Sequence, residues 1–201
     1  RNDAHRLIEE CMVAANVEAA KFLHKHRMPA LFRVHAPPDE ERIDELKRFL
    51  ATWGVFLPQV GEVTPQVLQE TLRQVHGRPD AAMLEGMIIR SLSQAVYQPE
   101  NIGHFGLALA EYAHFTSPIR RYPDLLVHRA IRHVIEKGGA GDFVHANAAM
   151  VLFGQECSLR ERRADEAARE VTAFLKCEYV KHRLGEEFDG IVTGVTEFGL
   201  F

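Results

Sequence analysis

The sequence predicts an α+β fold that is mainly helical and is followed by the first strands of a small β-barrel. Apolar residues recur at helical spacing through most of residues 3–183, a short central stretch is rich in strand-forming residues, and a strand-and-turn pattern begins after Gly185. Because glycine commonly ends helices, we place a boundary at this point. We therefore expect one domain over residues 1–184 and the incomplete start of a second over residues 185–201.

Four helices are predicted in the first half of the chain. In the first, residues 3–27, Leu7, Ile8 and Cys11 share one helical face that we expect to lie toward the core, with Cys11 as a small buried hydrophobe. On this assignment Glu10 and Asn16 lie off the buried stripe. The next helices are predicted from proline or threonine-proline at their starts and from glycine at their ends. They cover residues 39–52, 65–76 and 79–91.

The second half begins with a stretch that favours strands. Two short strands are predicted, one at Val96-Tyr97 and one at 105–109. Helices then return over residues 123–137 and in a shorter segment that ends at Gly154. The sequence Ser158-Leu159-Arg160-Glu161 matches a capping box, which predicts the start of a long helix over residues 159–183. Residues 188–195 and 198–201 favour a β-hairpin.

Composition excludes some function classes and limits others. A net charge of −4 and an isoelectric point near 6.3 weigh mildly against nucleic-acid binding, although local charge matters more than the total. No apolar run reaches the roughly 20 residues of a membrane helix, so no membrane partner is expected. Three cysteines far apart in the sequence fit a reducing compartment, and we expect a cytoplasmic protein. The histidine spacing matches no metal motif.

The segment His114-Phe115-Thr116-Ser117-Pro118-Ile119-Arg120-Arg121-Tyr122-Pro123-Asp124 carries the strongest chemical signal. Its two prolines predict that Arg120 and Arg121 are held in a tight turn at a helix N-terminus. Free backbone N–H groups and two guanidinium groups at such a place form an anion site, for which phosphate is a natural ligand. A pair of solvated or salt-bridged surface arginines is the alternative that the residues leave open.

This segment resembles the signature of the RNB catalytic domain, found in the ribonuclease II and ribonuclease R family of exoribonucleases. Three further stretches, at 7–16, 101–109 and 161–167, resemble the same family in the same order, and the last favours its ribonuclease R branch. Residues 190–201 resemble the opening of an S1 domain, an OB-type barrel. The resemblance implies the C-terminal half of an RNB catalytic domain followed by the start of an S1 domain. Both ends of the chain, which lacks an initial methionine, are expected to continue in the natural protein.

The family resemblance implies a processive 3′→5′ exoribonuclease that hydrolyses single-stranded RNA to nucleoside 5′-monophosphates with Mg²⁺. The aspartates that hold the metal in this family should precede Arg1, so the isolated chain is expected to be inactive and to hold no metal ligand. Single-stranded RNA is the expected partner, no small-molecule cofactor is expected, and the full-length protein is expected to be monomeric.

The resemblance also assigns roles to particular residues. Arg120 matches the arginine that contacts the scissile phosphate, with Arg121 and Tyr122 as neighbouring substrate contacts. Either Glu9 or Glu10 matches a glutamate near the terminal nucleotide, and the spacing does not choose between them.

Further RNA contacts are proposed from the residues themselves. Phe105, next to His104, offers a face for base stacking, although a core position is the alternative. Arg163 and Arg169 lie on the long predicted helix, where we expect the polar face to border the RNA, although interleaved acidic residues also fit an ion-paired surface.

Two other functions stay open. The first is a non-catalytic RNA-binding protein of RNB type, and the second is a helical interaction domain whose arginine turn binds an acidic protein. The slope of affinity against salt concentration would distinguish phosphate binding from the second alternative.

Overall fold

The computed structural model describes residues 2–58, 63–190, 192 and 195–200. The chain forms two compact units, Arg1–Leu159 and Arg160–Phe201. None of the helices among the described residues is both long enough and apolar enough to cross a membrane.

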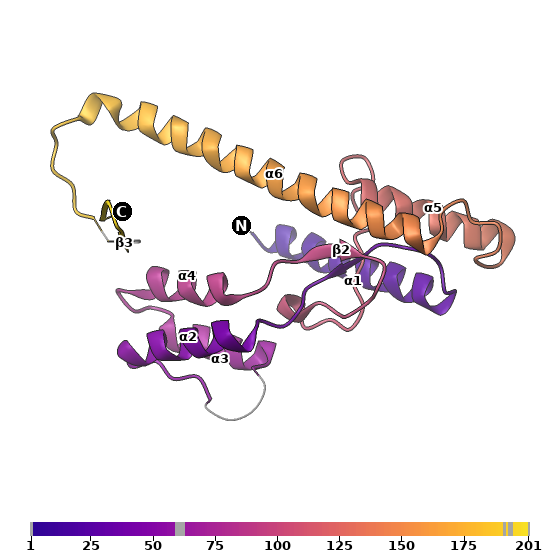
Figure 1. Ribbon diagram of the computed structural model, residues 1–201, viewed down its shortest axis with the longest axis horizontal. Coiled ribbons are helices and arrows are strands. Elements are labelled where there is room, and N and C mark those ends of the chain that lie inside the picture. Colours follow the sequence, from indigo (N-terminus) through magenta and orange to yellow (C-terminus); the bar gives the residue numbers. More distant parts are fainter. Residues whose placement is uncertain (1, 59–62, 191, 193–194, 201) are drawn as a thin grey trace. The chain divides into compact units, whose positions relative to one another are not determined.

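The described elements are mostly helices, as predicted (Figure 1). In order along the chain they are α1 Asp3–Lys25, β1 Phe32–Val34, α2 Glu40–Thr52, α3 Pro65–Val75, α4 Ala81–Ser91, β2 Val96–Gln98, the 3-10 turn η1 Phe105–Leu107, α5 Tyr122–Lys137, α6 Asn147–Val180, the 3-10 turn η2 Lys181–Arg183, β3 Val195–Thr196 and β4 Gly199–Leu200. The predicted starts and ends of α2, α3 and α5 are confirmed to within one or two residues. The Thr64 side chain caps α3, and a glycine with positive φ follows each of the three helices: Gly54, Gly77 and Gly138.

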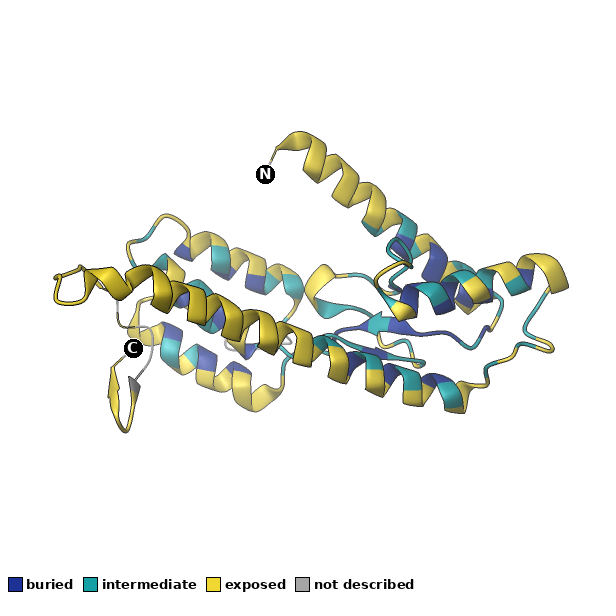
Figure 2. Ribbon diagram, turned by 90° about the horizontal axis from the view of Figure 1, so that it is seen from above, coloured by how far each residue is buried: buried dark blue, intermediate teal, exposed yellow. Residues whose placement is uncertain are grey.

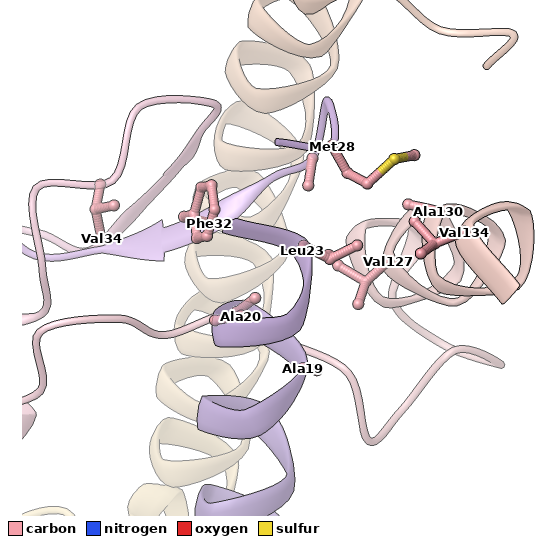
Figure 3. Packing of buried hydrophobic residues seen from close by; sticks show 11 residues of the cluster. Ala19, Ala20, Leu23, Met28, Phe32, Val34, Val127, Ala130 and Val134 are labelled. Atoms are coloured by element: carbon pink, nitrogen blue, oxygen red, sulfur yellow. The ribbon is translucent and has the colours of Figure 1, made fainter. Parts of the chain in front are cut away.

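The first unit is built on separate apolar clusters. One joins the second half of α1 to α5 and β1, and Figure 3 shows Leu23 of α1 pointing toward Val127 of α5. A second lies among α2, α3 and α4, with Leu50, Leu84 and Ile88 at its centre. The α1–α5 cluster is the one that positions the candidate site, since α5 begins directly after the arginine turn.

The predicted buried face of α1 is wrong for the first half of the helix. Leu7 and Ile8 are 64% and 60% exposed, and Cys11 is also exposed (Figure 2). The buried positions are Asn16, Ala19, Ala20 and Leu23, which come later and lie on another face. Small alanine side chains let the second half approach α5 closely, whereas the apolar stripe of the first half remains exposed.

The second predicted strand is also wrong. Strand β2 pairs antiparallel with β1, a strand that the sequence did not predict, with Tyr97 opposite Arg33. Residues 105–107 form a 3-10 turn instead, because His104 Nδ1 accepts a hydrogen bond from the Leu107 N–H and Ala108 takes a left-handed conformation at φ 54°.

Helix α6 is continuous where a break and a new start were predicted. Gly154 and Ser158 both lie inside it. The Ser158 hydroxyl donates to the Gly154 carbonyl at 2.8 Å and accepts from the Tyr97 N–H at 2.9 Å, so it joins the helix to β2 instead of capping a helix. Gly154 permits this contact, since a Cβ there would lie 2.5 Å from the Tyr97 carbonyl oxygen.

The second unit contains the rest of α6, η2 and a short hairpin. Val195 pairs with Leu200 and Thr196 with Gly199. Part of the predicted first strand, residues 191, 193 and 194, lies outside the described residues, as does residue 201 at the end of the second. The S1 barrel and the domain boundary near residue 185 therefore stay predictions.

We predict that Gly154→Ala destabilises the protein by about 1–3 kcal/mol, because the new methyl group would push α6 away from β2. Gly86→Ala on α4 is the matched control: its Cβ would meet only the flexible Arg90 side chain, at 3.7 Å. The control should gain about 0.5–1 kcal/mol, since alanine favours helices over glycine. Urea unfolding measures both, and equal effects of the two substitutions would contradict the close packing at Gly154.

Candidate functional site

The two arginines of the signature segment lie in a single turn directly before α5. The Ser117 carbonyl accepts hydrogen bonds from the Arg120 and Arg121 N–H groups at 3.3 Å and 3.0 Å. Arg121 is the N-cap residue of α5, which begins at Tyr122 and has Pro123 in its first turn. The predicted turn at a helix N-terminus is thereby confirmed. We refer to residues 117–121 as the arginine turn.

A buried carboxylate holds the arginine turn. Asp124 is fully buried, and its Oδ1 accepts from the Ser117 N–H at 2.7 Å and from Arg121 Nη2 at 2.8 Å. A buried charge is tolerated when it is paired and hydrogen-bonded, and both conditions hold here. The two arginines consequently differ: Arg121 is half-buried in this ion pair, whereas the Arg120 side chain is exposed.

The residues that lead into the arginine turn are held by both neighbouring helices. The Phe115 N–H donates to Asn16 Oδ1 of α1 at 2.9 Å, and the Phe115 carbonyl accepts from His128 Nε2 of α5 at the same distance. Asn16 Nδ2 also donates to the Tyr112 hydroxyl at 3.0 Å. We expected Asn16 to lie off the buried face of the helix. This expectation is wrong, because Asn16 is only 3% exposed.

A groove of about 780 Å³ runs along α1 beside the arginine turn. Glu9 and Arg121 both line it, whereas Glu10 is absent from its lining. The spacing left the choice between the two glutamates open, and the geometry places Glu9 in the α1 groove. The remaining walls come from α1, η1 and the segment before the turn: Asn2, Ala4, His5, Ile8, Met12, Val13, Asn16, Leu107, Tyr112 and Thr116.

Three buried polar atoms at the turn have no hydrogen-bond partner among the described residues. They are Thr116 Oγ1, Arg121 Nε and Asp124 Oδ2. Unpaired buried polar atoms are costly, and native proteins generally satisfy them with protein groups, water or ligand. Thr116 and Arg121 also line the α1 groove, although these particular atoms are themselves buried.

Neutral histidines pack behind the groove. His104 and His114 both make edge contacts with the Tyr112 ring, at centroid distances of 5.4 Å and 5.7 Å. Burial lowers the pKa of His114 to about 3, with a further contribution from the Arg121 charge. Burial likewise lowers the pKa of His104 to about 4, helped by His35. Both rings are therefore uncharged at neutral pH, so neither adds positive charge beside the turn.

Several predicted contact residues are not among those that line the α1 groove. Phe105 is half-buried, packs against the α2–α4 cluster and lines a separate cavity with Pro37, Ile43 and Lys47. Tyr122 is 43% exposed at the first position of α5. Arg163 and Arg169 are exposed on the part of α6 that belongs to the second unit, so their approach to the turn stays a prediction.

The described residues do not fit a magnesium site. No group of three or more histidine, cysteine, aspartate or glutamate side chains gathers among them in a way that could hold a metal ion. Mg²⁺ requires hard oxygen ligands in near-octahedral geometry. No chemical step is therefore assigned to a metal held by this part of the chain.

Asp124→Asn should lower the free energy of unfolding by about 3–5 kcal/mol, since it leaves the half-buried Arg121 charge without its partner. Glu136→Gln, which breaks a solvent-exposed ion pair with Arg132 on the same helix, is the matched control and should have no measurable effect. Urea unfolding at neutral pH tests this, and an Asp124→Asn variant as stable as the control would rule out the anchoring role.

The lowered pKa of His114 predicts a pH dependence of stability. The unfolded chain takes up a proton near pH 6.5 but the folded protein only near pH 3, so the stabilising contribution is complete above 6.5 and is lost as the pH falls toward 3. The loss approaches about 1.4 kcal/mol per pH unit. His114→Phe should flatten the stability curve in this window.

Tyr97→Phe is the control for the pH experiment. It removes the hydrogen bond of 2.8 Å between the Tyr97 hydroxyl and His114 Nδ1 but leaves the histidine buried. Because burial is the main cause of the low pKa, this variant should keep the wild-type slope. The stability of each variant is measured by thermal unfolding between pH 4 and pH 7. This range extends below the ordinary histidine pKa of about 6.5. A slope lost in Tyr97→Phe and retained in His114→Phe would contradict this assignment.

Known proteins match this chain over its full length. The RNB domain family model matches residues 1–137. The chain is 49% identical over 209 residues to ribonuclease R of Escherichia coli strain K12 and 48% identical over 210 residues to ribonuclease R of Vibrio cholerae serotype O1. Each match covers 100% of this chain and 26% of the relative, so the chain spans about a quarter of the length of these relatives.

A solved structure shows the same fold. Ribonuclease R of Mycoplasma genitalium, in complex with ribose-methylated single-stranded RNA, matches with a TM-score of 0.87 at 23% identity, and the match covers 100% of this chain and 32% of that chain. At this identity the likeness shows the fold alone. The match to the family model confirms the resemblance inferred from the signature segment: this chain belongs to the RNB domain family.

Proposed function

We propose that this chain forms one wall of the active site of a processive 3′→5′ exoribonuclease, which hydrolyses single-stranded RNA to nucleoside 5′-monophosphates with Mg²⁺. The observation that carries the proposal is the exposed Arg120 guanidinium on a turn fixed by a buried ion pair, beside the α1 groove. The relatives named ribonuclease R support the choice of RNA as substrate.

Phosphate suits the arginine turn for physical reasons. The N-terminus of α5 presents backbone N–H groups with a partial positive charge, and Arg120 adds a full charge on a planar donor. Arg121 keeps its carboxylate partner, so Arg120 is the guanidinium of the turn that extends into solvent. Its position on a rigid turn lets it meet a phosphate without a large loss of backbone freedom.

The proposed role of Arg120 is to stabilise the negative charge that develops on the phosphoryl oxygens during hydrolysis. Fixed donors aimed at a developing oxyanion are worth about 10²–10³ in rate in other enzymes. A charge placed before the reaction needs little reorganisation during it. The hydrogen bonds that the Arg120 and Arg121 N–H groups donate to the Ser117 carbonyl hold the backbone of the turn in place.

The α1 groove is the proposed place of the terminal nucleotide. Its volume of about 780 Å³ falls in the usual range for small-ligand sites. Ile8 and Met12 offer an apolar wall for a base, and Glu9 offers a carboxylate that can accept from sugar hydroxyls.

The proposal places the Mg²⁺ ligands in a part of the longer protein that this chain does not include, since the described residues do not fit such a site. Isolated, the chain is therefore proposed to be inactive. For the full-length protein we keep the monomeric state and a cytoplasmic location, the latter supported by three cysteines that lie far apart in the sequence.

The direct test follows full-length protein on 5′-labelled single-stranded RNA with Mg²⁺. Wild type should give a series of products shortened from the 3′ end. Arg120→Ala should slow turnover by about 10²–10³ with RNA affinity little changed, because the lost interaction acts mainly in the transition state. Arg73→Ala, an exposed arginine paired with Glu70 on α3, is the matched control and should behave as wild type.

Other outcomes would change the assignment. Equal losses of turnover and affinity in Arg120→Ala would remove the catalytic role and leave a binding role. A wild-type protein that binds RNA without shortening it would favour a non-catalytic RNA-binding protein. Affinity for RNA that does not fall with rising salt would contradict phosphate recognition altogether.

A further inference from the structure

We propose that Asn16 and His128 are positioning residues that place Arg120 for phosphoryl chemistry by clamping the backbone of Phe115 from two helices. The inference rests on the function proposed above, and it extends that function to two side chains that take no part in the chemistry. Neither residue belongs to the arginine turn: Asn16 lies on α1 and His128 on α5.

The clamp engages both backbone polar groups of one residue. Asn16 Oδ1 accepts from the Phe115 N–H at 2.9 Å, while His128 Nε2 donates to the Phe115 carbonyl at 2.9 Å. The rings of Phe115 and His128 also stack, with centroids 4.2 Å apart and planes 9° from parallel. Phe115 is thus fixed in position by its N–H group, its carbonyl group and its side chain.

Asn16 itself has little freedom to move. It is only 3% exposed, and its amide nitrogen donates to the Tyr112 hydroxyl at 3.0 Å. Both the oxygen and the nitrogen of the Asn16 amide are therefore hydrogen-bonded within the protein. Their partners, Phe115 and Tyr112, lie three residues apart on the segment that leads to the turn. An apolar residue at position 16 would leave the Phe115 N–H without this partner, which is costly at a half-buried position.

The clamp is linked to Arg120 through a short, continuous chain of contacts. Ser117 lies two residues after Phe115, and its N–H donates to the buried Asp124 carboxylate. The Ser117 carbonyl accepts from the Arg120 N–H at 3.3 Å. A shift of Phe115 therefore moves the group that fixes the backbone of Arg120. Misplacement of a reacting group by about 1 Å can cost about 10²-fold in rate.

The test is a double-mutant cycle in the full-length protein on single-stranded RNA with Mg²⁺. Asn16→Leu keeps the side-chain size and removes the hydrogen bonds, and His128→Phe keeps a stacking ring and removes the donor. Each should lower turnover by about 10–100-fold. His128→Phe should leave RNA affinity within about 2-fold, because His128 does not line the α1 groove and only placement is lost. Asn16→Leu also alters a residue of the groove wall, so its effect on placement is measured as turnover at saturating RNA. In the Arg120→Ala background each should lower turnover by less than about 2-fold, since the group being positioned is absent.

Thr71→Val is the matched control. Thr71 is 1% exposed and donates a buried hydrogen bond to the Val67 carbonyl on α3, within the α2–α4 cluster. It tests whether any lost buried hydrogen bond lowers turnover, and it should leave turnover unchanged. Equal losses from Asn16→Leu in both backgrounds, or a loss matched by Thr71→Val, would overturn the positioning role.

Hydrogen exchange provides a readout that does not depend on activity. Amides of residues 115–121 should exchange faster in Asn16→Leu than in wild type, while those of α3 should not change. Unaltered exchange at 115–121 would overturn the clamp even if turnover fell. If wild type shortens no RNA, the proposed function fails, and the exchange result alone decides whether the clamp exists.

Discussion

The arginine turn depends on the fully buried carboxylate of Asp124. A charge without solvent must be compensated locally, and here the Ser117 N–H and the Arg121 guanidinium compensate it. These two contacts connect the first residue of the turn to its last and attach both to α5. Because removing either partner would leave a buried group unpaired, the segment 117–124 is confined to a narrow range of conformations.

This constraint divides two adjacent arginines into a structural and an exposed one. Arg121 stays with Asp124, and Arg120 is presented to solvent at the N-terminus of α5. The same helix supplies His128, and α1 supplies both Asn16 and the wall of the groove that contains Glu9. The cluster between α1 and α5 packs the second half of α1 against the helix that follows the turn (Figure 3). In the proposed function this packing aligns the terminal nucleotide with the phosphate to be cleaved.

Local sequence signals predicted most of the helices and the arginine turn, whereas features set by distant contacts were missed. Thr64 caps α3 and Gly138 ends α5 by geometry that involves only near neighbours. The sequence around Ser158 resembled a helix cap, but the Ser158 hydroxyl accepts a hydrogen bond from the Tyr97 N–H of β2, 61 residues away in the sequence. The sequence likewise did not identify Asn16 as a site residue, because its partner Phe115 lies 99 residues away along the chain. The exposure of Leu7 and Ile8 could not be predicted either. Helical spacing shows that one face of a helix is apolar, but it does not show whether another element covers that face.

The most direct measurement is a structure of the full-length protein with a single-stranded RNA that it cannot cleave. If the buried ion pair divides the two arginines as described, an Arg120 nitrogen will lie about 2.7–2.9 Å from an oxygen of the scissile phosphate, a distance typical of charge-assisted hydrogen bonds. Arg121 will remain on Asp124, and the terminal nucleotide will occupy the α1 groove. A structure in which Arg121 leaves Asp124 to bind the phosphate, while Arg120 stays in solvent, would contradict this account.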